Sequence, residues 1–221
     1  MSVATADLDG DGDLDLLAAN SGSHDISIAR NDGRGHFPSV TSILAGSAPV
    51  SVVTADFNGD GMVDIAEANS LSRTVFVLLN HGGSFGPTVT SVPIADSPSA
   101  LAAGDVDGDG SVDLIVGARG ALVFRNQGDA TFAPADSSAL PDSPAAVWVA
   151  DLDGDGDLDI AAALSRDANG LGHHLLRRRL EGCPLGTTPV TDWLGASFLR
   201  CGRIRRLRLY SSAASWNGSR C

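Results

Sequence analysis

The chain has 221 residues and a formal net charge of −12, and 43% of its side chains are hydrophobic. This apolar content excludes a wholly disordered acidic chain, because there is ample apolar surface to bury. No apolar run approaches the roughly 18–20 residues of a membrane-spanning helix, so we expect no membrane span.

Charge divides the chain into two parts. Residues 1–164 contain 24 acidic side chains and five arginines, whereas residues 165–221 contain three acidic side chains and ten arginines. All three cysteines lie in the second part, and the chain contains no lysine. The two parts are therefore interpreted separately.

Four similar segments follow one another in the first part, and each contains an acidic loop. The loops begin at Asp7, Asp56, Asp105 and Asp151, at spacings of 49, 49 and 46 residues. A near-constant period of this length is typical of repeat architectures such as propellers.

The second segment shows the order of elements that the segments share. A run of small apolar residues (49–57) leads into the acidic loop (56–64), and a second run (63–69) follows. An alternating apolar run (74–80) then leads through an Asn-Gly turn to a β-branched run (87–95). Short runs rich in Val, Ile and Thr, divided by Gly, Asn and Asp, predict strands. Four strands in roughly 40–50 residues are typical of a β-propeller blade.

The predicted fold is all-β. It is a partial β-propeller of about four four-stranded blades with a metal loop in each, followed by an irregular C-terminal tail. We expect the first run of each unit to form an inner strand, because small side chains fit where blades crowd at the axis. The predicted blades are residues 1–48, 49–97, 98–143 and an incomplete 144–165.

All four loops follow the pattern D-x-[DN]-G-D-G-x-x-D, with oxygen-bearing side chains at positions 1, 3, 5 and 9. The glycine at position 6 allows a sharp turn that folds these oxygens around one point. Ca²⁺ takes six to eight oxygen ligands at about 2.3–2.6 Å, and a backbone carbonyl at position 7 and water can complete such a set. A solvated acidic turn is the alternative, and the four in-register copies favour a metal site.

The loop pattern alone does not identify the fold. An EF-hand requires a glutamate at position 12 and flanking helices, and a dockerin-like helical pair would have two copies rather than four. Only the second loop carries that glutamate, between strand-like segments, so we interpret Glu67 as a coincidence. Position 12 is occupied in order by Ala18, Glu67, Val116 and Ala162.

Together the loops and turns resemble the FG-GAP/VCBS repeats of bacterial extracellular proteins, which are related to the calcium-loop blades of the integrin α-chain propeller. The resemblance covers about residues 1–165, and it includes the N-x-G…F turns that end at Phe37, Phe85 and Phe132. The Gly-Ala-Pro element of FG-GAP repeats is not clear, so the match favours the VCBS form. The family implies a β-propeller, usually seven-bladed, with Ca²⁺ in the hairpin between the first two strands of a blade.

The resemblance also implies which residues would bind each Ca²⁺. The implied side-chain ligands are Asp7, Asp9, Asp11 and Asp15; Asp56, Asn58, Asp60 and Asp64; Asp105, Asp107, Asp109 and Asp113; and Asp151, Asp153, Asp155 and Asp159. The implied carbonyl ligands at position 7 are those of Asp13, Met62, Ser111 and Asp157.

The chain departs from the family at its beginning. Met1 aligns with Val50, so the sequence starts at the first strand of a blade. A seven-bladed ring would need about 330 residues at this period. We therefore expect a fragment of a longer secreted protein, or an internally assigned start codon, with the remaining blades in the full-length protein.

The tail, residues 166–221, departs from the repeat as well. The Asn-Gly turn of the fourth unit should fall near residues 172–177, but this segment contains His173 and His174, which we interpret as surface residues. The tail is interpreted as a frameshifted or non-native extension, a poorly ordered natural tail, or a basic surface for nucleic acid or anionic lipid. A basic cluster alone is weak support for nucleic acid, which is not expected as a partner. Neither a zinc site nor a disulfide framework is defined by Cys183, Cys201 and Cys221, and the sequon at Asn217 carries little weight.

No catalytic constellation stands out, because nearly every carboxylate belongs to a repeated loop. The first hypothesis is a non-enzymatic, Ca²⁺-stabilised propeller module at the cell surface or in the medium that mediates adhesion or binds an unknown protein or carbohydrate. The second is an accessory domain of a larger secreted enzyme, such as a polysaccharide lyase or hydrolase. The third is a reading frame without a stable product, because an open half-ring exposes blade faces and strand edges.

Overall fold

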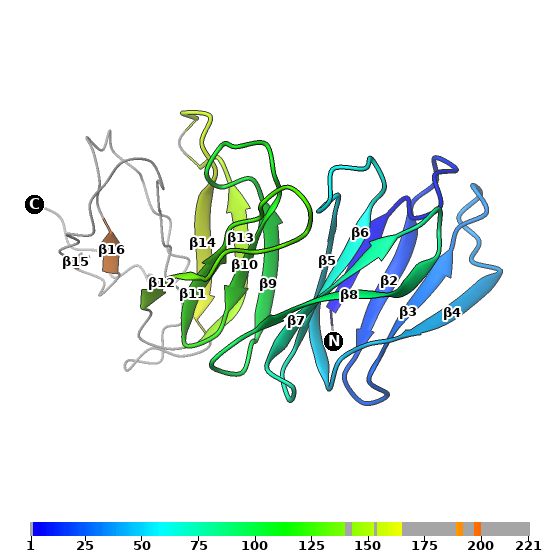
Figure 1. The fold of residues 1–221 in the computed structure, drawn as a ribbon, viewed down its shortest axis with the longest axis horizontal. Coiled ribbons are helices and arrows are strands. Elements are labelled where there is room, and N and C mark those ends of the chain that lie inside the picture. Colours follow the sequence, from blue (N-terminus) through cyan, green and yellow to red (C-terminus); the bar gives the residue numbers. More distant parts are fainter. Residues whose placement is uncertain (1, 140–142, 153, 165–188, 192–196, 200–221) are drawn as a thin grey trace, which may run out of the picture.

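The computed structural model describes residues 2–139, 143–152, 154–164, 189–191 and 197–199. Every regular element in these residues is a β-strand (Figure 1), and the strands form antiparallel sheets that stand side by side as blades. The prediction of an all-β partial propeller is therefore confirmed. The described part contains no helix with the length and apolar character needed to span a membrane.

Among the described residues, three sheets have four strands each, paired in the order of the sequence, and two sheets have two strands each. Blade 1 consists of β1 (Ser2–Ala6), β2 (Asp15–Asn20), β3 (Asp25–Arg30) and β4 (Ser39–Leu44). Blade 2 consists of β5 (Pro49–Ala55), β6 (Asp64–Asn69), β7 (Thr74–Asn80) and β8 (Phe85–Pro93). Blade 3 consists of β9 (Ala100–Gly104), β10 (Asp113–Gly117), β11 (Gly120–Phe124) and β12 (Asp136–Ala139). Blade 4 consists of β13 (Pro144–Ala150) and β14 (Asp159–Leu164).

The hydrophobic core lies between neighbouring blades. Successive side chains of a strand point to opposite faces of its sheet, so Ile65 of β6 packs towards blade 1 while Ala66 packs towards blade 3. Leu17 of β2 meets Ile65 in the first core, and Leu114 of β10 lies with Ala66 in the second. A third core joins blades 3 and 4 through Ile115 and its neighbours. Each inner blade therefore buries both of its faces.

The first strands of the blades lie next to one another, in the order β1, β5, β9 and β13. Small residues are needed where these first strands approach one another closely. Gly104 ends β9, and a Cβ atom there would lie 2.8 Å from Cγ2 of Val149 in β13. That distance is shorter than real carbon contacts, so the approach of blades 3 and 4 depends on the missing side chain.

Several predictions fall outside the described residues and stay predictions. They concern the ligand Asp153, the turn near residues 172–177, the histidines His173 and His174, the sequon at Asn217 and the cysteines Cys183, Cys201 and Cys221. Within the tail the structure describes one short antiparallel pair, β15 (Pro189–Thr191) with β16 (Ser197–Leu199).

Candidate metal centre

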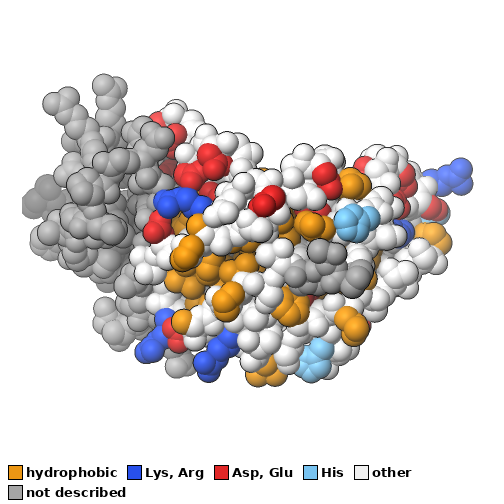
Figure 2. Space-filling model, in the orientation of Figure 1, with side chains coloured by type: hydrophobic (Ala, Val, Ile, Leu, Met, Phe, Trp, Pro, Cys, Tyr) orange, Lys and Arg blue, Asp and Glu red, His pale blue; other side chains and the backbone are white. Residues whose placement is uncertain are grey.

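Each acidic loop joins the first and second strands of its blade. The four loops lie along the same edge of the row of blades (Figure 1), and acidic side chains gather on that edge of the surface (Figure 2). The repeat thus places four chemically similar loops side by side on one end of the molecule.

The aspartate at position 1 holds the loop in its turn. In loop 1, Asp7 Oδ1 accepts the backbone N–H of Gly10 (2.8 Å) and Oδ2 accepts that of Gly12 (3.0 Å). Both glycines have positive φ angles, +79° and +93°, which other L-residues rarely adopt. The glycine at position 4 is therefore needed as well as the one at position 6 that the sequence analysis identified. The same two bonds recur around Asp56, Asp105 and Asp151.

The aspartate at position 5 accepts the backbone N–H of the residue at position 7. In loop 2 this bond joins Met62 N to Asp60 Oδ1 at 2.9 Å, and it is the main reason why the pKa of Asp60 lies below its ordinary value. The carboxylate is therefore held ionised within the loop. The corresponding pairs in the other loops are Asp11 with Asp13, Asp109 with Ser111, and Asp155 with Asp157.

Among the described residues, the carboxylates at positions 1, 3 and 5 converge in loops 1 and 3. One oxygen from each member of the set lies within 4.8 Å of the others, and the sets are Asp7, Asp9 and Asp11, and Asp105, Asp107 and Asp109. In loop 2 the middle position is Asn58, whose amide donates to Asp60 Oδ2 at 2.9 Å. Because all the atoms that could bind a metal here are oxygens on one tight turn, the residues fit a hard cation such as Ca²⁺.

The aspartate at position 9 lies beneath the loop and is buried in every blade. In loop 2, Asp64 Oδ2 accepts the N–H of Phe57 (2.9 Å) and Oδ1 accepts the N–H of Asn80 (2.8 Å). The carboxylate thus ties its loop to the Asn-Gly turn between the third and fourth strands. Each oxygen keeps a second lone-pair site that a cation could use. The corresponding residues in the other loops are Asp15, Asp113 and Asp159.

Burial raises the pKa of three of these carboxyl groups, those of Asp64, Asp113 and Asp159. For Asp113 the loss of solvation, reinforced by the negative charges of Asp107 and Asp109, raises the pKa to about 6. Without a cation, an ionised carboxylate at position 9 of these three loops is therefore costly to the folded state.

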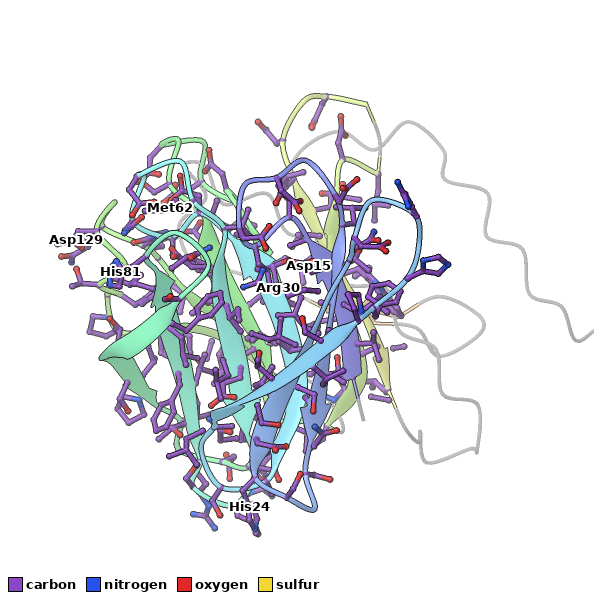
Figure 3. The ribbon with its side chains drawn as sticks, turned by 90° about the vertical axis from the view of Figure 1, so that its right-hand side faces the viewer. Asp15, His24, Arg30, Met62, His81 and Asp129 are labelled. Atoms are coloured by element: carbon purple, nitrogen blue, oxygen red, sulfur yellow. The ribbon has the colours of Figure 1, made fainter. Side chains whose placement is uncertain are left out.

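Two kinds of residue outside the loops contact them, and the sequence analysis missed both. The side-chain amide of Asn80 donates to the carbonyl of Leu8 in loop 1 (2.9 Å) and to that of Val63 in its own blade (2.9 Å). Arg30 contacts the buried Asp15 of loop 1 (Figure 3). The signal for the asparagine was its recurrence at the start of each Asn-x-Gly turn, where it was interpreted only as a turn former.

Glu67 lies within β6, away from the loop end of the strand. Its side chain is fully buried, and Oε1 accepts the backbone N–H of Gly46 (2.7 Å) and the amide of Asn69 (3.2 Å). Gly46 belongs to the connection between blades 1 and 2. Burial raises the pKa of Glu67, so this residue is an ionisable group of the blade interface.

A sequence profile described as an FG-GAP-like repeat matches residues 7–67, 58–116 and 115–162. Two similar solved structures are crystal structures of BBS1N in complex with ARL6DN, one soaked with mercury and one with lead. The first has a TM-score of 0.51 and 16% identity and covers 74% of this chain and 47% of that chain. The second has a TM-score of 0.55 and 16% identity and covers 86% of this chain and 59% of that chain.

No relative was found among curated proteins. At 16% identity the likeness to the solved structures shows the fold alone. The chain spans about half the length of these two chains.

Proposed function

Because the chain belongs to the FG-GAP-like repeat family, we propose that it is a non-enzymatic, calcium-binding propeller module that binds a protein or carbohydrate outside the cell. The observation that carries the proposal is the convergence of the carboxylates at positions 1, 3 and 5, as in Asp105, Asp107 and Asp109. Loops of this kind in extracellular modules bind Ca²⁺ at roughly 10⁻⁴–10⁻³ M, which suits the medium better than the cytosol.

The metal would stabilise the fold. The carboxylates of a loop repel one another and the one at position 9 is buried, so a bound Ca²⁺ would offset their negative charge. Side chains at positions 1, 3, 5 and 9, such as Asp56, Asn58, Asp60 and Asp64, would hold it together with the Met62 carbonyl. Since the unfolded chain does not assemble this set, the free energy of binding adds to the free energy of unfolding.

The open face of blade 1 supports a larger propeller. Val3, Val40 and Leu44 are exposed by 59%, 64% and 89%, and their registers place them on the face that meets no other blade among the described residues. The equivalent face of blade 2 carries Ile65, which is fully buried against blade 1. We propose that a further blade of the same type covers this face, and that the ligand binds to the completed propeller.

Thermal unfolding of the full chain in millimolar CaCl₂ and in EDTA tests the metal proposal. Each site filled at 100 times its Kd adds about 2.7 kcal/mol to the free energy of unfolding, so the midpoint should rise clearly with CaCl₂. MgCl₂ at the same concentration should raise it less, because Mg²⁺ demands a more regular, smaller shell. A glycan array probed in CaCl₂ and again in EDTA tests the ligand class.

Two variants with the same charge change make the test specific. Asp109→Asn removes a convergent carboxylate of loop 3, whereas Asp96→Asn removes a carboxylate outside the four loops. The calcium-dependent shift should shrink in Asp109→Asn and persist in Asp96→Asn. Identical unfolding in EDTA and CaCl₂, or equal shifts in the two variants, would show that the loops are not structural calcium sites.

A further inference from the structure

Loop 1 already contains a cationic partner. Arg30 is the last residue of β3, and its Nη1 lies 2.5 Å from Asp15 Oδ2 and 3.7 Å from Asp9 Oδ2. Its Nη2 donates to the carbonyl of Gly83 in blade 2 at 2.8 Å. The arginine side chain is only 18% exposed and that of Asp15 only 1%. This guanidinium therefore sits among the carboxylates at positions 3 and 9 and also contacts blade 2. Figure 3 shows Arg30 beside Asp15.

Loop 3 has an arginine at the corresponding place, and it contacts the carboxylate at position 3 together with Asp136 of β12. Arg125 directly precedes Asn126, as Arg30 directly precedes Asn31. Its Nε lies 3.0 Å from Asp107 Oδ2 at position 3, and its Nη1 lies 2.9 Å from Asp136 Oδ2. This side chain is more exposed than that of Arg30, at 38%.

Loop 2 lacks both members of the pair. The residue before the turn asparagine is Leu79, and position 3 is the neutral Asn58. In the three blades whose turn is described, the two loops with an aspartate at position 3 have an arginine directly before the turn. The loop with an asparagine at position 3 has no arginine there. An arginine that merely filled space would have no reason to follow the charge of position 3.

We propose that Arg30 and Arg125 are internal counter-ions that set the calcium affinity of loops 1 and 3. Each arginine neutralises part of the carboxylate cluster when no metal is bound, and so stabilises the metal-free blade. Each also competes with Ca²⁺ for the same oxygens and repels it, so it weakens binding at that loop. Loop 2 has no such competitor. The proposal rests on calcium binding by the loops as proposed above.

Charge arithmetic sets the expected size of the effect. A single positive charge within about 5–6 Å of a divalent cation in a well-solvated site changes the affinity on the order of tenfold. The change should be larger at loop 1, where the arginine is less exposed and contacts two carboxylates of the loop itself, than at loop 3, where it contacts one.

The test compares Arg30→Gln with Arg34→Gln in the full chain. Both variants remove one positive charge from blade 1, but Arg34 lies in the exposed turn beyond Asn31. Calorimetric titration with CaCl₂ should show one site tightened about tenfold in Arg30→Gln and no comparable change in Arg34→Gln. Adding Asp11→Asn to Arg30→Gln should abolish the gain, which assigns it to loop 1.

Unfolding in EDTA provides a readout without metal. Arg30→Gln should lower the melting temperature of the metal-free chain more than Arg34→Gln does, because Asp15 loses its buried partner. If Arg30→Gln does not fold in EDTA, Arg125→Gln gives the same test at a more exposed site.

The outcomes separate this inference from the proposed function. A wild-type chain that binds no Ca²⁺ overturns both. A wild-type chain that binds Ca²⁺, with equal or weaker affinity in Arg30→Gln and Arg125→Gln, overturns the counter-ion role alone and makes the arginines positioning residues. Tighter binding together with lower metal-free stability supports it.

Discussion

Replacement of Asn80 by alanine should loosen the junction between blades 1 and 2. The Asn80 side chain is 2% exposed. Its amide donates to the carbonyls of Leu8 and Val63, both at 2.9 Å, and its Oδ1 accepts the N–H of Gly83 at 2.8 Å. Leu8 belongs to loop 1, so a single side chain spans both blades.

The structure sets the size of the effect. Three hydrogen bonds at about 1 kcal/mol each, with two carbonyls left without this donor, give a loss of about 3–4 kcal/mol. This is a large fraction of the roughly 5–15 kcal/mol by which domains are stable. Asn126 makes the equivalent bonds to Phe57 and Val112, and alanine there should cost a similar amount.

Asn31 provides the matched control. It begins the same turn in blade 1 and makes three side-chain bonds, to Leu14, Gly33 and Gly35, all in an exposed setting and all within its own blade. Exposed bonds of this kind are replaced by water, so Asn31→Ala should cost only about 1 kcal/mol or less.

Urea unfolding followed by circular dichroism, at one fixed CaCl₂ concentration, measures all three variants. The reasoning requires Asn80→Ala and Asn126→Ala to lose clearly more stability than Asn31→Ala. Equal losses in the three variants would refute it, because the bond across the blades would then contribute nothing.

Three further predictions concern the buried acids and one glycine. Glu67→Gln should stabilise the protein at neutral pH, because burial raises the pKa of Glu67 in the folded state. The wild type should lose stability relative to this variant as the pH rises from 4.5, the ordinary pKa of a glutamate, through the raised pKa of the folded state. If urea unfolding shows a stability gain of Glu67→Gln that does not vary with pH, ionisation of Glu67 is not its cause. Calcium binding should release protons near pH 6, because Asp113 has a pKa of about 6 without metal and a cation favours the carboxylate. Calorimetric titrations with CaCl₂ in two buffers of different ionisation enthalpy should then give different heats at pH 6, and the two heats should converge at about pH 8. Equal heats in the two buffers at pH 6 as well would exclude proton release on calcium binding. Gly46→Ala should destabilise the fold by about 1–3 kcal/mol, because the new Cβ would lie 2.4 Å from the Asn69 side chain. Gly86→Ala is the control in thermal unfolding, because a Cβ there would lie 3.6 Å from its nearest neighbour, His81. Equal melting temperatures in the two variants would show that the connection between blades 1 and 2 shifts to accommodate the new Cβ.

The blades could be predicted from the sequence because each repeat contains loop residues that cannot vary freely. The glycines at positions 4 and 6 of each loop need positive φ angles, and Asp7 and its equivalents hold those turns through backbone N–H groups. These constraints are local, within nine residues, so they leave a pattern that recurs at 49, 49 and 46 residues. The strands between them follow from short β-branched runs.

The contacts between blades could not be predicted in the same way. Asn80 and Leu8 are 72 positions apart, and an asparagine at the start of an Asn-Gly turn is sufficiently explained by the turn itself. Arg30 lies outside the loop pattern, and the pairing of β2 with β3, which sets Leu16 opposite Ala29, brings it beside Asp15. Glu67 was compared with an EF-hand position, whereas its partners, Gly46 and Asn69, lie at the blade connection.

The loops hold neighbouring blades together as well as their own hairpins. In blade 2, Asp64 accepts the backbone N–H of Asn80, and the side chain of the same asparagine donates to the Leu8 carbonyl of loop 1. The position-9 carboxylate therefore anchors the residue that joins the two blades. If Ca²⁺ binds as proposed and fixes Asp64, it also fixes this anchor, so its stabilising effect should extend to the interface. Asn80→Ala should then reduce the gain in melting temperature that CaCl₂ gives, in addition to lowering stability in EDTA; an undiminished gain would show that each loop stabilises only its own blade.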